Sequence, residues 1–226
     1  MRPQAPTYVY LHGFASGPGS AKAQFLRSRF HESGLTLQIP DLNQNDFSHL
    51  TLTRQIQQVL ALVTAAEQVV LIGSSLGGLT AALLAEQPAL TQKLQQLVLL
   101  APAFGFLTHW LPQLGPDSLR RWQQTGWLDI YHYGEERLLP LSYEFVIDAQ
   151  QYASLQLQPA VPTLILHGRQ DEVIPVQASR QYAAARAGVS LVELESDHSL
   201  TDVQSQIWLE TQNFLAVTTP SSPQIL

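Results

Sequence analysis

The chain has 226 residues, of which 45% are hydrophobic and 13% are charged, a balance typical of a folded globular protein and not of a disordered one. Its formal net charge of −6, without runs of lysine or arginine, argues against nucleic acid or an anionic membrane as a partner. Because the chain contains no cysteine, disulfides, cysteine–zinc sites and a thiol nucleophile are excluded.

Short apolar runs alternate along the chain with segments of helical pattern. The predicted strands are Tyr8–Leu11, Leu35–Ile39, Gln68–Ile72, Leu97–Leu100, Thr163–Leu166 and Ser190–Leu194. The predicted helices are Ser20–Ser33, Leu50–Ala66, Leu76–Glu86, Pro175–Ala187 and Gln204–Ala216. Four of the strands are almost continuously apolar, as expected for a parallel sheet that is buried on both faces. The pattern predicts one α/β domain over residues 1–226, with a mainly parallel sheet of about six strands flanked by helices.

The two ends of the sequence carry no recognisable targeting segment. No basic stretch leads an apolar one near residue 1, and no apolar run reaches the roughly 18 residues of a membrane-spanning helix. We therefore expect a cytoplasmic protein with neither a signal peptide nor a membrane span. The Pro/Ser-rich stretch at about 218–226 is predicted to be a loose tail.

An insertion at about 104–158 interrupts the alternation of strands and helices, because a simple crossover between strands needs far fewer residues. Its aromatic side chains either bury a helical excursion or form the wall of an apolar substrate pocket. The insertion leaves from the carboxyl edge of the sheet, where ligands bind in open α/β sheets, so we expect a helical lid. The candidate pocket residues are Trp110, Trp122, Trp127 and Tyr131.

The sharpest motif begins directly after the strand Gln68–Ile72, where Gly73 to Gly78 read GSSLGG and a helix follows. The pattern G-x-S-x-G between a strand and a helix is typical of a nucleophile elbow, in which a tight, strained turn exposes the serine hydroxyl. This pattern makes Ser75 the candidate nucleophile. Ser74 is the competing serine, but its spacing to the glycines does not fit the motif.

A serine nucleophile needs a base, and the base needs an orienting acid. In the chain order of such enzymes, the acid and then the histidine follow the serine. Asp171 lies in the loop after a predicted strand, with Glu172 as a neighbouring rival and Asp148 as a weaker alternative from the insertion. His198 is the only histidine beyond Asp171, and it lies after the last predicted strand. We therefore expect Asp171 and His198 to complete a triad with Ser75.

The loop after the first strand is the expected source of an oxyanion donor. We predict that the backbone N–H groups of Phe14 and Leu76 form the oxyanion hole, and that His12 is structural. The glycines at positions 17 and 19 lack the third glycine and the lysine pattern of a nucleotide-binding loop. The seven histidines show no metal-ligand spacing, so we expect neither a metal nor a cofactor.

Several segments together resemble a known family. They are YLHGFAS at 10–16, SAKA at 20–23, IGSSLGG at 72–78, APA at 101–103, GRQDEV at 168–173 and DH at 197–198. These segments resemble the α/β-hydrolase superfamily, and within it the small bacterial esterases of the YqiA type. The resemblance implies hydrolysis of carboxylic esters or thioesters of short to medium acyl groups. In this chain Ala101 replaces the asparagine of that family, and the insertion is longer and richer in tryptophan.

From these observations we expect a serine hydrolase that cleaves esters or thioesters of small apolar acyl substrates through an acyl-enzyme. One alternative is a carbon–carbon bond hydrolase or lyase with the same triad, in which Arg120, Arg121 or Arg137 of the lid would hold a substrate carboxylate. Another alternative is a receptor-like protein that binds a ligand on the hydrolase fold. A peptidase is a weaker hypothesis. A dehalogenase is disfavoured because its nucleophile is normally aspartate, and Ser75 occupies that position here. The expected partner is a small molecule, and the chain is expected to be a monomer or a homodimer.

Overall fold

A computed structural model describes residues 6–153, 155, 157 and 161–216. The strands of its central sheet are β1 (Thr7–Leu11), β2 (Leu37–Gln38), β3 (Val69–Ser74), β4 (Leu94–Leu100), β7 (Thr163–Gly168) and β8 (Val189–Leu194). Their order across the sheet is β2-β1-β3-β4-β7-β8, and every neighbouring pair is parallel. The predicted α/β class and six-stranded parallel sheet are confirmed. The strand predicted at Leu35–Ile39 shrinks to the two residues of β2 at the edge.

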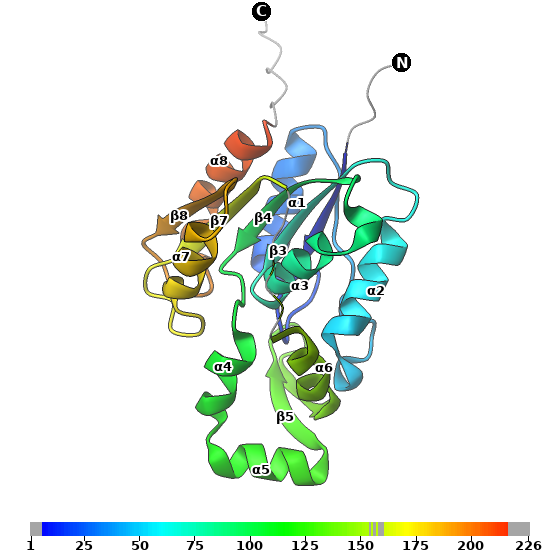
Figure 1. Ribbon diagram of the computed structural model, residues 1–226, viewed down its shortest axis with the longest axis vertical. Coiled ribbons are helices and arrows are strands. Elements are labelled where there is room, and N and C mark those ends of the chain that lie inside the picture. The colour runs from blue at the N-terminus through cyan, green and yellow to red at the C-terminus, as the bar shows by residue number, and fades with distance from the viewer. Residues whose placement is uncertain (1–5, 154, 156, 158–160, 217–226) are drawn as a thin grey trace, which may run out of the picture.

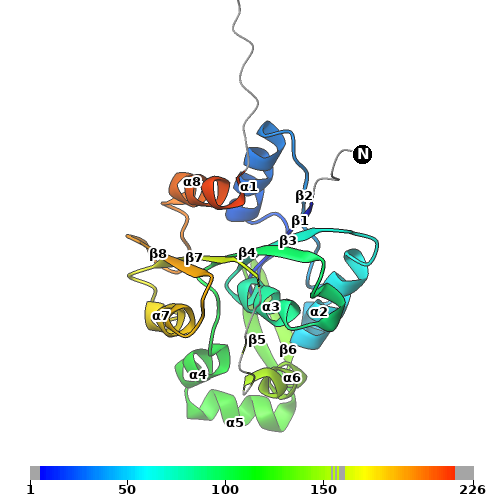
Figure 2. The same cartoon turned by 45° about the horizontal axis from the view of Figure 1, so that its top comes forward.

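Helices cover both faces of the sheet (Figure 2). One face carries α1 (Ala21–Glu32) and α8 (Gln204–Leu215), and the other carries α2 (Leu52–Leu62), α3 (Leu76–Ala85) and α7 (Val176–Ala184). Strand β3 is buried along its whole length, because alternate side chains point to opposite faces. Val69 and Leu71 join the apolar core under α2 and α3, while Val70 and Ile72 join the core under α1 and α8. This double burial is why the strand reads as a continuous apolar run in the sequence.

The insertion lies beyond the carboxyl ends of the central strands (Figure 1). It consists of α4 (Phe106–Trp110), a 3₁₀ turn (Leu111–Leu114), α5 (Pro116–Thr125), β5 (Trp127–His132), β6 (Arg137–Ser142) and α6 (Glu144–Ala153). The expectation of a helical lid therefore needs correction, because β5 and β6 form an antiparallel hairpin. The reason is a period-two pattern, in which side chains of β5 alternate between exposed and partly or fully buried positions.

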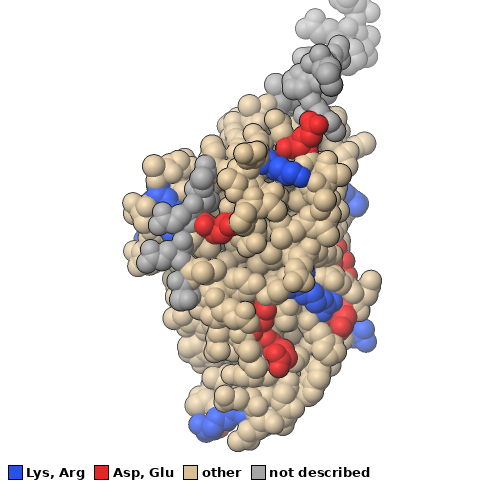
Figure 3. All heavy atoms as spheres, turned by 45° about the vertical axis from the view of Figure 1, so that its right-hand side comes forward, with Lys and Arg blue, Asp and Glu red and all other residues tan. Residues whose placement is uncertain are grey.

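Two further 3₁₀ turns, Phe47–His49 and Pro88–Leu90, complete the regular structure. Within the described ranges, no helix is both long enough and apolar enough to cross a membrane. Charged side chains are sparse on the face drawn in Figure 3, where blue and red atoms lie scattered among uncharged residues. The tail predicted at about 218–226 lies outside the described residues.

Candidate active site

The turn between β3 and α3 holds Ser75 in a strained backbone conformation, with φ 53° and ψ −116°. L-residues rarely adopt a positive φ, so the surrounding structure must impose it. The turn also needs close backbone contacts. A Cβ atom at Gly73 would collide with the carbonyl of Gly77, and one at Gly77 would collide with the carbonyl oxygen of Leu11. Without side chains, Gly73 and Gly77 allow these backbone segments to pack closely together. Ser75, between them in the turn, is left partly exposed.

Two loops at the same edge of the sheet bring His198 and Asp171 to Ser75. Asp171 follows β7, and His198 follows β8, the neighbouring strand. The Nε2 atom of His198 lies 3.0 Å from Ser75 Oγ, and its Nδ1 atom lies 2.7 Å from Asp171 Oδ2. With Nδ1 protonated, the imidazole donates to the carboxylate and accepts from the serine hydroxyl, which is the arrangement that a general base requires.

The Asp171 side chain is wholly buried, and both of its oxygens accept hydrogen bonds. The Oδ1 atom accepts the N–H groups of Val173 and Ile174 at 2.9 and 2.8 Å. The Oδ2 atom accepts from His198, and the Nε2 atom of His167 lies 3.0 Å from it. Burial is the largest single influence and raises the pKa of Asp171, but the bonds from His167, His198 and Ile174 together hold this pKa well below its usual range. Asp171 is therefore a carboxylate at neutral pH.

The loop after β1 lies against the nucleophile. A Cβ atom at Gly13 would be in van der Waals contact with the Ser75 Cβ, at 3.4 Å, so the backbone preceding Phe14 passes directly beside the serine. Leu76 is the first residue of α3, where backbone N–H groups have no acceptor within the helix. Phe14 and Leu76 thus flank Ser75, and their role as oxyanion donors stays a prediction.

Ser75 and His198 open onto a cleft of about 690 Å³. Phe14 and Val173 line its apolar part, and the exposed Tyr133 of the hairpin turn lines its far side. The cleft thus lies between the sheet edge and the insertion, as an active site in an open α/β sheet should.

Lys22, the second residue of α1, also lines the cleft, a position that was not predicted from the sequence. Burial lowers the pKa of its ammonium group to about 8, although the charges of Asp171 and Asp197 act to raise it. The chain therefore keeps a partly desolvated cation beside the triad. A lysine two residues inside a helix that starts at the active-site loop was the available signal.

The four aromatic residues predicted to line the pocket are placed elsewhere. Trp122 is fully buried, and its Nε1–H donates to the carbonyl of Leu141 at 2.9 Å. Trp110 packs edge-on against Phe14 and so lies behind the cleft wall. Trp127 and Tyr131 are 46% and 48% exposed on β5. The structure brings none of these four to the described lining of the Ser75 cleft, where the aromatic residues are Tyr10, Phe14 and Tyr133.

Asp148 and two other titratable residues of this region, Asp197 and His12, have partners outside the candidate triad. Asp148 accepts the Thr53 N–H at 3.0 Å and so serves the first turn of α2. Asp197 accepts from the backbone N–H of Ser199 at 2.8 Å. His12 is fully buried and accepts the Leu42 N–H on Nε2 at 2.9 Å, a structural contact.

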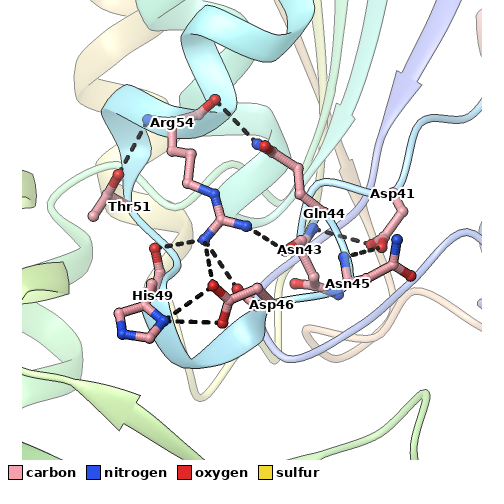
Figure 4. Close-up of polar contacts among 8 residues, drawn as sticks. All are labelled: Asp41, Asn43, Gln44, Asn45, Asp46, His49, Thr51 and Arg54. Carbon is pink, nitrogen blue, oxygen red and sulfur yellow. Dashed lines mark hydrogen bonds and ion pairs between the residues drawn. The ribbon is translucent and has the colours of Figure 1, made fainter.

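A second, polar cleft of about 750 Å³ adjoins the first and shares Tyr133 with it. One wall of this cleft is the loop after β2. The guanidinium of Arg54, on α2, holds this loop in place (Figure 4). This guanidinium donates to the carbonyl oxygens of Asn43, Asp46 and His49 at 2.7, 3.0 and 2.6 Å. The Asn43 amide also donates to the carbonyl of Ser16 at 2.8 Å and contacts His132 Nε2 at 3.2 Å. The loop, the hairpin and the loop after β1 are thus tied together.

Among the residues that the structure describes, no group of three or more His, Cys, Asp or Glu side chains could hold a metal ion.

Comparison with known proteins places this site in a family context. The uncharacterised protein family UPF0227 matches residues 7–215. The mitochondrial palmitoyl-protein thioesterase ABHD10 is 25% identical over 198 residues in Mus musculus and 26% identical over 198 residues in Homo sapiens. These alignments cover 81% of this chain and 64% and 62% of the relatives. The chain thus spans less than two thirds of the length of these curated relatives.

Solved structures share the fold. The α/β hydrolase domain-containing protein 10 from mouse matches with a TM-score of 0.76 and 20% identity, over 96% of this chain and 92% of that one. Est1E from Butyrivibrio proteoclasticus, with ferulic acid bound, matches with a TM-score of 0.73 and 21% identity, over 94% and 90%. Together with the family match, these likenesses confirm the α/β-hydrolase fold and the resemblance to its small YqiA-type members.

Proposed function

The chain belongs to the uncharacterised protein family UPF0227, and from that premise we propose that it is a serine hydrolase that cleaves carboxylic esters or thioesters through an acyl-enzyme. The observation that carries the proposal is the continuous hydrogen-bonded chain from Ser75 through His198 to Asp171, with distances of 3.0 and 2.7 Å. A serine within reach of a neutral imidazole, itself oriented by a buried carboxylate, is the arrangement that activates a weak nucleophile.

In the first half of the proposed reaction, Ser75 Oγ attacks the carbonyl carbon while His198 Nε2 takes the hydroxyl proton. Negative charge develops on the carbonyl oxygen, and the N–H groups of Phe14 and Leu76 bind it. Collapse of this intermediate breaks the bond to the leaving oxygen or sulfur. His198 then returns the proton to the leaving group, and the acyl group stays on Ser75.

In the second half, water enters the cleft and His198 takes one of its protons. The resulting attack on the acyl-enzyme passes through the same oxyanion hole and releases the acid. Asp171 stays ionised throughout, because its role is to hold the imidazole tautomer and to stabilise the imidazolium. No metal or cofactor takes part in this proposal.

Two lines of evidence support esters and thioesters as the substrate class. The curated relatives are named palmitoyl-protein thioesterases, and Est1E was solved with ferulic acid, an aromatic acid. The Ser75 cleft offers Phe14 and Val173 as apolar surface for a small acyl or aryl group. The leaving group would then face Tyr133 and the adjoining polar cleft.

The carbon–carbon hydrolase alternative lacks a supporting contact. Such an enzyme needs a cation that holds the substrate carboxylate, and the insertion offers three arginines. Arg120 pairs with Asp117, Arg137 lies 3.4 Å from Glu135, and Arg121 is exposed on α5. None of the three belongs to the described lining of the Ser75 cleft. Ester or thioester hydrolysis is therefore the function that the geometry supports best.

The first experiment is covalent labelling of the purified full-length chain with a fluorophosphonate probe, beside Ser75→Ala and Ser74→Ala. Esters and thioesters of matched acyl groups are assayed in the same samples, with the acyl chain lengthened stepwise. We expect labelling of the wild type and of Ser74→Ala, and a loss of turnover of about 10⁴-fold or more in Ser75→Ala. Absence of both labelling and turnover in the folded wild type would overturn the proposal, and a folded protein that binds these compounds without turnover would favour the receptor-like alternative.

The compartment and the assembly remain predictions. A cytoplasmic location follows from the sequence expectations above, whereas the curated relatives are named as mitochondrial. Fractionation of cells that express the chain with an epitope tag tests the predicted cytoplasmic location. Light scattering coupled to gel filtration distinguishes the monomer from the homodimer.

A further inference from the structure

The proposed triad does not end at Asp171. His167, at the end of β7, is fully buried and lies four residues before the carboxylate. Its Nε2 atom lies 3.0 Å from Asp171 Oδ2 and 2.9 Å from the carbonyl oxygen of Ile174. Its Nδ1 atom lies 2.8 Å from the hydroxyl of Ser179 on α7. A second imidazole thus shares the carboxylate oxygen that serves His198.

The neighbours of His167 determine where its proton lies. Both groups facing Nε2, the carboxylate of Asp171 and the carbonyl of Ile174, can only accept, so Nε2 must carry the proton. In the neutral imidazole, Nδ1 is then an acceptor, and the Ser179 hydroxyl is the group that can donate to it. Ser179 is itself fully buried. The two acceptors at Nε2 therefore select the tautomer in which His167 can donate to Asp171, and the Ser179 hydroxyl supports it by donating to Nδ1.

We propose that His167 is a positioning residue of the active site, which fixes the rotamer and the charge of Asp171 through its Nε2–H, and that Ser179 supports this tautomer by donating to Nδ1. The inference rests on the proposed function, since it assigns His167 a role in the hydrolysis carried out by Ser75. In this arrangement five side chains lie in one series of polar contacts of 2.7 to 3.0 Å, in the order Ser179, His167, Asp171, His198 and Ser75.

The physical reason lies in the competition for Asp171. Its Oδ1 is held by two backbone N–H groups, so only Oδ2 faces side-chain donors. If His167 no longer donates, less of the carboxylate's negative charge is compensated, so it attracts the proton on His198 Nδ1 more strongly. The doubly protonated imidazole is then favoured, and this form cannot accept the proton of Ser75. The other ionisable groups that face Asp171 are His198 and the ammonium of Lys22, and neither replaces the lost donor on this side.

The test compares His167→Leu, His167→Gln and Ser179→Ala by the pH profile of kcat/KM and by kcat per fluorophosphonate-labelled site. We expect His167→Leu to lower kcat about 10- to 100-fold with little change in KM, since one charge-assisted hydrogen bond is lost. The acidic limb of the profile should move to higher pH by about half a unit or more. Glutamine can place an amide N–H near the Nε2 position, so His167→Gln should recover most of the rate.

Ser179→Ala keeps the imidazole and removes only the hydroxyl that donates to its Nδ1. We expect about a 3- to 10-fold lower kcat and a shift of the acidic limb in the same direction. Ile165→Ala is the matched control, because Ile165 is fully buried on the same face of β7 and its side chain has no hydrogen-bonding group. It should lower stability but leave kcat per labelled site and the pH profile unchanged.

Nuclear magnetic resonance of the imidazole nitrogens in the wild type, with Ser75→Ala as a second sample, provides a readout that needs no turnover. We expect His167 to carry its proton on Nε2, and Ser179→Ala to weaken that preference. Absence of labelling and turnover in the wild type would sink the proposed hydrolase but leave this tautomer measurable. A proton on His167 Nδ1 alone, or an unchanged acidic limb in both His167→Leu and Ser179→Ala, would overturn the positioning role. If His167→Leu does not fold, Ser179→Ala and His167→Gln decide the question.

Discussion

The candidate triad and the insertion lie at the same edge of the sheet, but different forces hold them. The triad residues sit in short turns directly after β3, β7 and β8, and backbone geometry places them: the positive φ of Ser75, the close approach at Gly77 and the amides on Asp171. The insertion is held by aromatic packing, in which Trp110 contacts Phe14, Phe145 and Trp122.

This difference separates chemistry from stability in the two regions. A change at the triad removes a hydrogen bond that the reaction needs, while little apolar surface is lost. A change in the insertion removes packed volume at a distance from the serine. We therefore expect mutations at the candidate triad to lower activity with little loss of stability, and mutations in the insertion to lower stability with little loss of activity. Three predictions concern these two regions.

The largest effect is expected at the orienting acid. Asp171→Asn should lower kcat/KM about 10⁴-fold, because the amide stabilises the wrong imidazole tautomer while preserving the shape of the side chain. The matched control is Asp148→Asn, which alters the rival carboxylate at the start of α2 and should leave kcat per labelled site near the wild-type value. Steady-state kinetics with active-site titration measures both. A larger loss in Asp148→Asn than in Asp171→Asn would mean that the acid is misassigned.

A large loss of stability, without a loss of chemistry, is expected in the insertion. Trp122→Ala removes a fully buried side chain and leaves the Leu141 carbonyl without its donor, so we expect a loss of roughly 3–5 kcal/mol in the free energy of unfolding. Urea denaturation measures this loss. The control Trp127→Ala alters a half-exposed tryptophan on β5 and should change stability by less than about 1 kcal/mol. At a temperature where both are folded, each should label at Ser75. Loss of labelling in folded Trp122→Ala would show that the two regions are not separable.

The smallest effect is expected for Lys22, whose ammonium group lies at the Ser75 cleft. The pKa of Lys22 lies at about 8, below its ordinary value of 10.5, so folding disfavours its charged form. The penalty is full below pH 8, shrinks as pH rises from 8 to 10.5, and vanishes above that range. Lys22→Met should therefore stabilise the fold by roughly 1–3 kcal/mol at pH 7, and the gain should shrink toward pH 10. Urea denaturation at the two pH values measures the difference. A gain that is independent of pH would mean that packing, not charge, is responsible.

Much of the architecture was predictable because its physical causes are local. Strands buried on both faces appear as continuous apolar runs, as in β3 and β7. The nucleophile turn requires glycines at fixed spacing, so Ser75 stands out, and the chain order of acid and base then selects Asp171 and His198. The structure brings these three within hydrogen-bond distance.

What the sequence did not predict depends on contacts between distant segments. The hairpin of β5 and β6 was missed although exposed Trp127 and Tyr131 alternate with half-buried neighbours, because the pattern is short and the insertion is rich in aromatics. These aromatics were assigned to the pocket because the sequence does not distinguish aromatic residues that pack inside the fold from those that line a cleft. His167 shows a similar limit. A histidine at the end of an apolar strand signals a buried polar contact, but only the fold places α7 and Asp171 on its two nitrogens.

The order of the strands has a consequence for when the chain becomes reactive. Among the described strands, β8 pairs only with β7 at the edge of the sheet. The loop after β8 brings His198 to a serine 123 positions earlier. A growing chain can form the nucleophile turn from its first hundred residues, yet the base does not exist until β8 has been synthesised and has docked. Long-range parallel pairing of this kind is slow to form. Assembly of the sheet therefore delays formation of the proposed triad until folding is nearly complete.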